Sequence, residues 1–207
     1  MKTILAAIDF SAASHNAAIY ATELAKAFNA RLVVFHAYLT IPVPLTEALV
    51  AVVPDDPEPF IAHRLNNEIE ELDPEGIVDM DARFMEGRAS DAIKEAARRF
   101  NADLIVLGMK KENKDVRRLF GSTVTALTGK TTVPLLVVPE EARFSPVRSI
   151  ALATDTDITD DTNSHITDTL CEIGQQFGSK LYVVRIANHL TADRFQRPGR
   201  LHNRPGR

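Results

Sequence analysis

The sequence predicts an α/β fold, in which an open, doubly wound parallel sheet of five strands carries helices on both faces. Five short apolar runs alternate with segments of helical periodicity along the first 139 residues. Several of these runs are apolar almost throughout, which is typical of parallel strands buried on both faces. The opening strand–helix–strand pattern then recurs near residue 150, which predicts an appended partial βαβ repeat.

The five predicted strands follow one another along the chain. The first ends at Asp9, and the third alternates apolar and polar residues, which suits the edge of a sheet. The fourth is apolar after its first residue, and a Val-Pro pair opens the fifth. Their predicted ranges are 3–8, 31–37, 78–84, 103–107 and 133–138.

Helical spacing fills the intervals between these strands. One apolar stripe begins at Ala17 and continues through residues 21, 24 and 28, and Ser11 is the expected N-cap of that helix. A second stripe begins at Ile93, after a turn at Gly87. Five prolines between residues 40 and 59 predict a long loop before a helix near 60–72.

The repeat comprises one strand, one helix and one further strand. Residues 148–155 match 2–9 at an offset of 146, and the following helix stripe and strand match their counterparts at an offset of 149. We therefore expect three regions, namely a domain at 1–139, a partial βαβ repeat at 146–187 and a basic, disordered tail at 188–207. An isolated βαβ unit must dock on another surface to bury its sheet.

Composition and charge exclude several classes of protein. The net charge is -4, and five arginines against one acid after residue 190 leave the body of the chain strongly acidic, so a nucleic-acid partner is not expected. No apolar run approaches the length of a membrane span, and the start lacks a signal-peptide pattern, so we expect a cytoplasmic protein. Cys171 is expected to be a small buried residue, and the six histidines show no metal-ligand spacing.

The stretch GSTVTALTGKTT at residues 121–132 holds two candidate phosphate loops. A Walker loop needs a glycine five residues before its Gly-Lys pair, and Val124 stands there, so Gly129 is expected to close a short helix instead. The left end is the better candidate, because a helix beginning at Ser122 would direct free amides towards the crevice beyond Asp9 and Gly108. Asp9 could bind ribose or base there, or cap the following helix.

At these positions the chain resembles the universal stress protein family. The resemblance rests on four segments, which are AIDFS at residues 7–11, the Gly87 turn, ADLIVLG at 102–108 and VPLLVVP at 133–139. The ATP-binding branch of that family carries G-x2-G-x9-G-[ST]. Here Gly108 and Gly121-Ser122 fit that spacing, but Lys111 replaces the second glycine.

The resemblance implies the strand order 3-2-1-4-5, a homodimer commonly formed through the fifth strand, and a stress-response or regulatory role. It also implies ATP, accompanied by magnesium, in the crevice between the first and fourth strands. Ala7, Ile8 and Asp9 would contact base and ribose, with Ala37 beside the adenine. The ribose and phosphates would lie along the remaining candidate positions, which are Gly108, Lys110, Lys111, Gly121, Ser122 and Thr123.

Lys111 leaves two interpretations open. Lys110 and Lys111 could supply positive charge to a triphosphate, or the Lys111 side chain could block the phosphate position and leave a dimerising structural stress protein without nucleotide. Hydrolysis is expected to be slow and incidental at most, because no nucleophile–base pair is visible. The strand ends also lack the paired acids of a response-regulator receiver and the glycine fingerprint of a Rossmann dehydrogenase.

Overall fold

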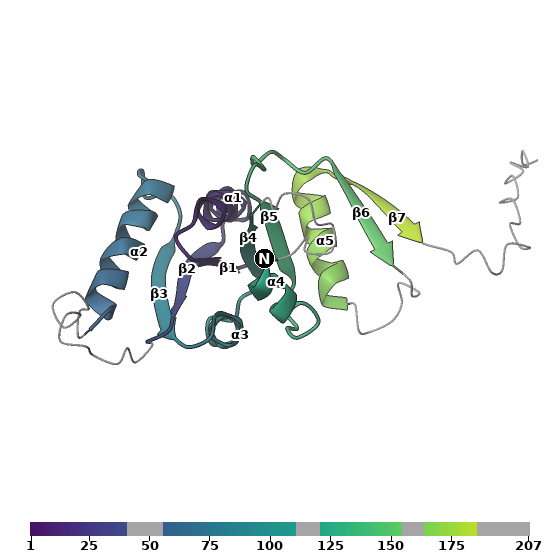
Figure 1. The fold of residues 1–207 in the computed structure, drawn as a ribbon. Helices are drawn as coiled ribbons and strands as arrows, with labels where there is room; N and C mark the ends of the chain where they lie inside the picture. The colour runs from purple at the N-terminus through teal and green to yellow at the C-terminus, as the bar shows by residue number, and fades with distance from the viewer. Residues whose placement is uncertain (41–55, 111–120, 155–163, 186–207) are drawn as a thin grey trace, which may run out of the picture.

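The computed structural model describes residues 1–40, 56–110, 121–154 and 164–185. Its main feature is a parallel sheet of five strands in the order β3-β2-β1-β4-β5, which confirms the predicted fold class (Figure 1). The bounds are Thr3–Ile8 for β1, Arg31–Tyr38 for β2, Met80–Glu86 for β3, Leu104–Met109 for β4 and Leu135–Pro139 for β5.

The winding of the sheet reverses between β1 and β4. From the central strand β1, the chain goes first to β2 and β3 on one side and later to β4 and β5 on the other. Ala7 near the end of β1 lies opposite Phe35 of β2 and Leu107 of β4. The carboxyl ends of β1 and β4 therefore meet at the position where open α/β sheets bind ligands.

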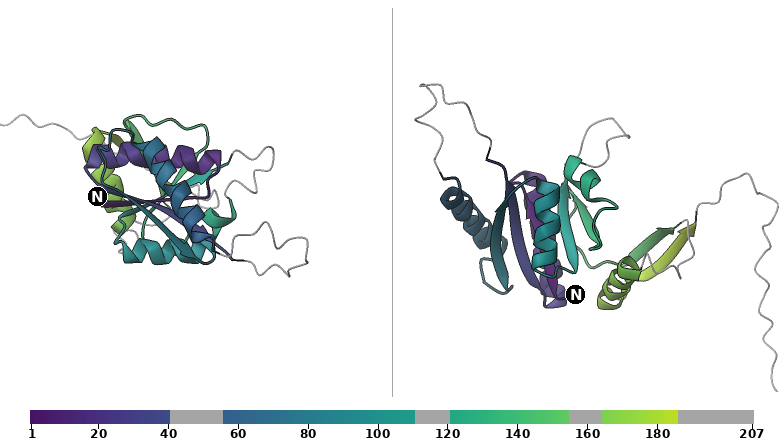
Figure 2. Two further views of the ribbon diagram at one scale, coloured as in Figure 1. Left: turned by 90° about the vertical axis from the view of Figure 1, so that its left-hand side faces the viewer. Right: turned by 90° about the horizontal axis from the view of Figure 1, so that it is seen from below.

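Helices cover both faces of this sheet (Figure 2). Helix α1 (Ala12–Phe28) and α2 (Glu58–Leu72) pack on one face, and α3 (Ala89–Arg99) and α4 (Ser122–Leu127) pack on the other. Successive β1 residues alternate between the two resulting cores, with Ile4 and Ala6 in one and Leu5 and Ala7 in the other. Along the described ranges, no helix combines the length and apolar character needed to cross a bilayer.

Helix α1 begins as predicted. Ser11 is its N-cap, and its hydroxyl accepts a hydrogen bond from the backbone N–H of Ser14 at 3.3 Å. Ser14 Oγ in turn accepts from the backbone N–H of Ser11 at 3.1 Å, which completes a capping box. The helix ends at Asn29, whose left-handed backbone provides the C-cap.

β1 has the predicted bounds, and the other strands of the sheet differ from their predicted ranges by at most two residues at either end. β3 begins at Met80 rather than at residue 78, and its residues are only partly buried because it lies at the sheet edge. Helix α2 begins at Glu58, inside the proline-bearing segment. Pro57 occupies its N-cap position, and the first turn of a helix accommodates Pro59 because proline is tolerated there. Residues 41–55 of the predicted loop lie outside the described part of the chain.

A second, smaller unit follows the five-stranded sheet. It consists of β6 (Ser149–Thr154), α5 (Ser164–Phe177) and β7 (Lys180–Arg185), and the two strands pair in parallel. Helix α5 lies between this two-stranded sheet and the main domain (Figure 1). Phe177 contacts Phe28 and Phe144 with ring centroids at 6.0 and 6.2 Å, and Gln176 Nε2 donates to the Ala27 carbonyl oxygen at 2.6 Å.

This unit leaves much of its apolar surface exposed. Residues 181–184 of β7 are about half exposed, whereas their repeat counterparts in β2, Leu32 to Phe35, are at most 1% exposed. Cys171 on α5 is also exposed, so the expectation of a buried cysteine is wrong. The reason is that β2 has neighbouring strands on both sides and helices on both faces, whereas β7, within the described residues, has only β6 and α5 beside it. The predicted tail at 188–207 falls outside the described ranges.

Candidate functional site

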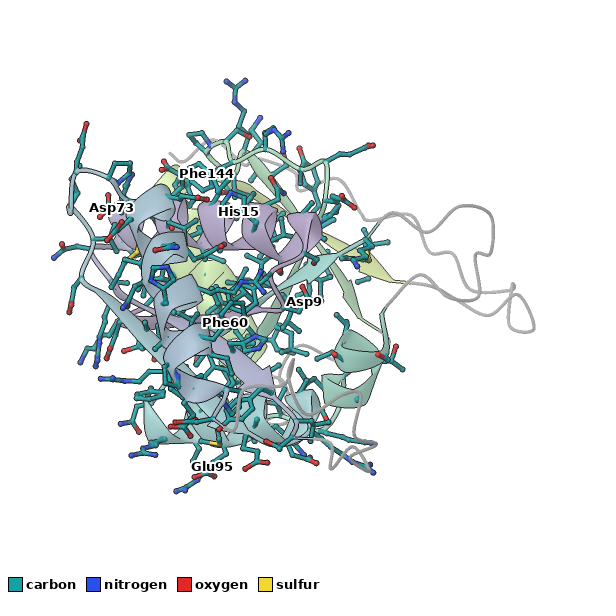
Figure 3. All side chains as sticks on the ribbon, turned by 60° about the vertical axis from the view of Figure 1, so that its left-hand side comes forward. Asp9, His15, Phe60, Asp73, Glu95 and Phe144 are labelled. Atoms are coloured by element: carbon teal, nitrogen blue, oxygen red, sulfur yellow. The ribbon has the colours of Figure 1, made fainter. Side chains whose placement is uncertain are left out.

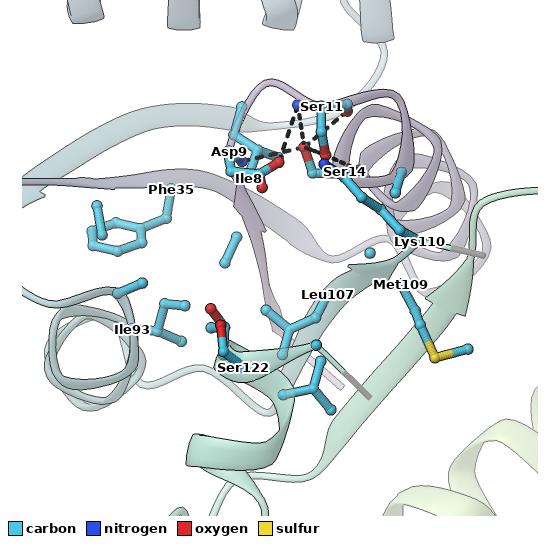
Figure 4. Close-up of a pocket in the computed structure, with 18 residues that line it drawn as sticks. Ile8, Asp9, Ser11, Ser14, Phe35, Ile93, Leu107, Met109, Lys110 and Ser122 are labelled. Atoms are coloured by element: carbon cyan, nitrogen blue, oxygen red, sulfur yellow. Dashed lines mark hydrogen bonds between the residues drawn. The ribbon is translucent and has the colours of Figure 1, made fainter. Parts of the chain in front are cut away.

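A cavity of about 330 Å³ opens at the carboxyl ends of β1 and β4, where the winding reverses (Figure 4). It is lined by residues from the ends of β1, β2 and β4, from the first turns of α1 and α4, and from α3. Every candidate site residue within the described ranges lies around it, namely Ala7, Ile8, Asp9, Ala37, Gly108, Lys110, Gly121, Ser122 and Thr123. Lys111 lies outside the described residues.

Gly108 is located where β4 passes close to the first turn of α1. A Cβ atom added to this glycine would lie 2.4 Å from the carbonyl oxygen of Ala13 and 2.7 Å from the backbone nitrogen of Ser14. No side chain fits at such distances without moving backbone. Gly108 therefore allows α1 to approach β4, and this approach forms one wall of the cavity.

Asp9 terminates β1 and organises the turn into α1. Its carboxylate oxygen Oδ1 accepts the backbone N–H of Ser11 at 3.0 Å, and its own backbone N–H donates to Ser14 Oγ at 3.2 Å. The helix N-cap is Ser11 rather than Asp9, so Asp9 supports the turn without capping the helix itself. The carboxylate is held at the rim of the cavity, as Figure 4 shows.

The charge state of Asp9 follows from its neighbours. Partial burial raises the pKa of the Asp9 carboxyl, but hydrogen bonds from Ser11 and Ser14 and the charge of Lys110 outweigh it, so the pKa is lowered. Asp9 is therefore a carboxylate at neutral pH, able to accept hydrogen bonds from ligand hydroxyl or amino groups.

The floor of the cavity is apolar, and the sequence does not identify most of the residues that form it. Phe35 and Leu107 are at most 4% exposed, and Ile93 of α3 contributes from the opposite side of the cavity. These residues have the apolar pattern of ordinary core positions, so no sequence signal separates them from the rest of the core. The register of Phe35 and Leu107 opposite Ala7 is the only clue to those two, and Ile93 lines the cavity through the position of α3.

The start of α4 completes the polar rim. Gly121 is the N-cap residue, and because it has no side chain, it provides no side-chain hydrogen bond to the first turn. A Cβ atom added to Gly121 would meet no atom within 4 Å. At the other end, Gly129 has a φ of +70°, and the Lys130 N–H donates to the Leu127 carbonyl oxygen at 2.9 Å. The prediction that GKTT closes a helix is confirmed.

The cavity thus combines an apolar slot with a polar and partly charged rim. A flat aromatic ring fits the chemistry of the slot, and hydroxyl groups fit the Asp9 carboxylate. Lys110 and the first amides of α4 suit an anionic group. A ligand with a base, a sugar and a phosphate carries all three kinds of group.

Comparisons with known proteins agree with this architecture. The universal stress protein family profile matches residues 1–139. Stress response protein NhaX of Bacillus subtilis (strain 168) is 31% identical over 159 residues, which cover 65% of this chain and 96% of that protein. A crystal structure of a universal stress protein in complex with cAMP is 25% identical with a TM-score of 0.51, covering 66% of this chain and 96% of that one.

The likeness to a longer structure extends beyond the main domain. A universal stress protein of Archaeoglobus fulgidus DSM 4304 superimposes with a TM-score of 0.65 at 15% identity, covering 90% of this chain and 68% of that one. That share of this chain exceeds the main domain, so the fold likeness includes the β6–α5–β7 unit. The profile match and the curated relative together show that this chain belongs to the universal stress protein family.

Proposed function

We propose that this protein is a cytoplasmic stress-response module that binds an adenine nucleotide, with ATP as the expected ligand. The observation that carries the proposal is the convergence of three separate segments, 7–9, 108–110 and 121–123, on one cavity. The cAMP complex of the related structure supports an adenine nucleotide as the class of ligand.

Different residues of the cavity would bind the base, the ribose and the phosphates. The adenine ring would lie in the slot beside Ala7, Ala37 and Ile93, and the ribose hydroxyls would donate to the Asp9 carboxylate. The phosphates would lie along Lys110 and the backbone of residues 121–123, with magnesium as the companion ion of the triphosphate. We assign no catalytic residue, and any hydrolysis would be slow and secondary to binding.

Equilibrium dialysis with ATP and Mg²⁺ tests the site, using Gly121→Glu as the blocking variant. A Cβ atom added to Gly121 would meet no described atom within 4 Å, so the backbone tolerates a side chain here. The added carboxylate would repel the phosphates. We expect at least a tenfold loss of affinity. Gln175→Glu, which adds the same charge at an exposed position on α5, should bind as the wild type does. Equal retention by Gly121→Glu and the wild type, or none by either, would overturn the proposal.

A second candidate is a dimerising stress protein without nucleotide. The observation that favours it is the exposure of four consecutive apolar residues of β7, Leu181 49%, Tyr182 54%, Val183 51% and Val184 47%. Apolar patches of this kind commonly mark association surfaces, and a second copy of the chain would bury them.

Light scattering after size-exclusion chromatography tests the dimer, and thermal stability with and without ATP separates the two candidates. A homodimer that depends on β7 should dissociate in the double variant Leu181→Ser and Val183→Ser, with or without ATP. If the double variant keeps the wild-type mass, β7 does not mediate association. If wild-type protein gains no thermal stability from ATP and is dimeric, the second candidate is favoured.

A further inference from the structure

A second hollow lies between the start of α1 and one face of α2, apart from the candidate nucleotide cavity. Apart from Ser11, which also lines the nucleotide cavity, its polar lining comes from His15 on α1 and from Arg64, Asn67, Glu68 and Glu71 on α2. In Figure 3, His15 lies on α1 beside α2. Nothing in the proposed nucleotide function uses these side chains.

Three of these residues bring metal-ligating atoms together. One nitrogen of His15 and one carboxylate oxygen each from Glu68 and Glu71 all lie within 4.8 Å of one another. His15 Nδ1 is 2.8 Å from Glu68 Oε1. The Glu68 side chain is only 11% exposed, so this carboxylate is held in place by its surroundings, whereas Glu71 is exposed and can turn towards an ion.

The donor set determines which class of ion fits. One imidazole nitrogen with two carboxylate oxygens suits zinc and related transition metals, whereas magnesium and calcium prefer oxygen ligands alone. Around a tetrahedral zinc ion, ligand atoms stand about 3.3 Å apart. His15 Nδ1 and Glu68 Oε1, now 2.8 Å apart, would therefore separate slightly, and Glu71, within 4.8 Å of both, would adjust to reach the ion. Zinc would take the place of the hydrogen bond between His15 Nδ1 and Glu68 Oε1.

We propose that His15, Glu68 and Glu71 form a binding site for a divalent transition metal, with zinc as the reference ion, that links α1 to α2. Water would fill the remaining coordination position. Arg64, the nearby cation, has its guanidinium carbon 3.9 Å from the centre of the Phe10 ring, so it is stacked on that ring. No ligand spacing is visible in the sequence, because His15 and Glu68 are 53 residues apart on different helices.

Isothermal titration with ZnCl₂ in the absence of nucleotide tests this site. The wild-type chain should bind one equivalent of zinc through this site and gain thermal stability, and MgCl₂ should produce neither effect. Glu71→Gln and His15→Gln should each weaken zinc binding about tenfold or more. Glu71 is exposed, so its variant should fold even if His15→Gln disturbs the start of α1. Visible absorption of bound Co²⁺ should report the loss of nitrogen ligation in His15→Gln.

Matched variants separate this site from nonspecific binding. Glu70→Gln makes the same chemical change at the neighbouring exposed position of α2, and His165→Gln removes an exposed histidine from α5. Both should retain wild-type zinc affinity. The proposal is overturned if the wild type binds no zinc, if Glu71→Gln binds as the wild type does, or if the control variants lose binding to the same degree.

Discussion

The backbone of Gly108 lies against the first turn of α1, where an added Cβ atom would stand 2.4 Å from the Ala13 carbonyl oxygen. Gly108→Ala should therefore lower the free energy of unfolding by about 1–3 kcal/mol, because α1 or β4 must shift to remove the overlap. Urea denaturation followed by circular dichroism would measure this loss.

Gly121 provides the matched control for that substitution. It belongs to the same predicted motif and has a φ of −58°, and an added Cβ atom would meet nothing within 4 Å. Gly121→Ala should lower the free energy of unfolding by less than about 1 kcal/mol, because alanine is a poorer N-cap than glycine but overlaps no neighbouring atom. Equal losses in the two variants would show that Gly108 is not required for close packing.

The lowered pKa of Asp9 predicts that the free energy of unfolding depends on pH. Partial burial raises its pKa, but the hydrogen bonds from Ser11 and Ser14 with the Lys110 charge lower it overall, below the ordinary 3.8 expected in the unfolded chain. The stabilisation is therefore present above about pH 3.8 and is lost as the pH falls through the lowered value. Asp9→Asn should lose less stability than the wild type between pH 5 and pH 3.

Chemical denaturation at both pH values would test this expectation. Asp168→Asn, at an exposed position of α5, provides the control and should follow the wild type. A wild-type pH dependence in Asp9→Asn would mean that the turn does not select the ionised carboxylate.

At the scale of single residues, the sequence identifies those site residues whose role depends on their immediate neighbours in the chain. Asp9 and Gly108 end predicted strands, and their spacing from the family pattern is readable without a structure. Phe35 and Ile93 could not be identified, because they line the cavity only through strand register and the position of α3. The pairing of His15 with Glu68 likewise depends on how α2 crosses α1.

Among the elements, α1 carries the clearest local signal for where it begins. Ser11 and Ser14 form a capping box, and Ser14 also receives the Asp9 N–H, so one short turn serves both the helix and the cavity rim. Ser11→Ala should cost about 1 kcal/mol in the free energy of unfolding.

Thermal or urea unfolding of Ser11→Ala would show this cost, with Ser145→Ala as the control. Ser145 is exposed in the segment between β5 and β6 and should change stability by less than about 0.5 kcal/mol. A neutral Ser11→Ala would indicate that Ser14 and the backbone alone hold the helix start.

Element types were predictable because apolar spacing distinguishes helices from buried strands. Element boundaries are harder to predict, as α2 shows. Its prolines predict a loop, but proline is also favourable in the first turn of a helix, and α2 begins among them. The failure at Cys171 has a different cause. The stripe of α5 matches that of α1, but α1 is enclosed by a complete domain and α5 is not.

For the whole molecule, the main question is how the β6–α5–β7 unit is held against the five-stranded domain. Among the described contacts, the Phe177 ring lies against both Phe28 and Phe144. The ion pair between the Met1 amino group and Glu172 spans 2.6 Å, but Glu172 is half exposed, so it adds little. Docking therefore depends chiefly on Phe177.

Phe177→Ala should release this unit while leaving the main domain intact. Each aromatic pair contributes about 1 kcal/mol beyond its buried area, so amide hydrogen exchange in β6 and β7 should accelerate about tenfold or more. Exchange in β1 and β4 should not change, because Phe177 touches only the margin of their core. Tyr182→Ala is the matched control, since that ring is 54% exposed and its loss should accelerate exchange in β6 far less than Phe177→Ala does. Unchanged exchange in β6 and β7 of Phe177→Ala would show that other contacts hold the unit. Equal acceleration in β1 would show that the unit and the main domain unfold as one body.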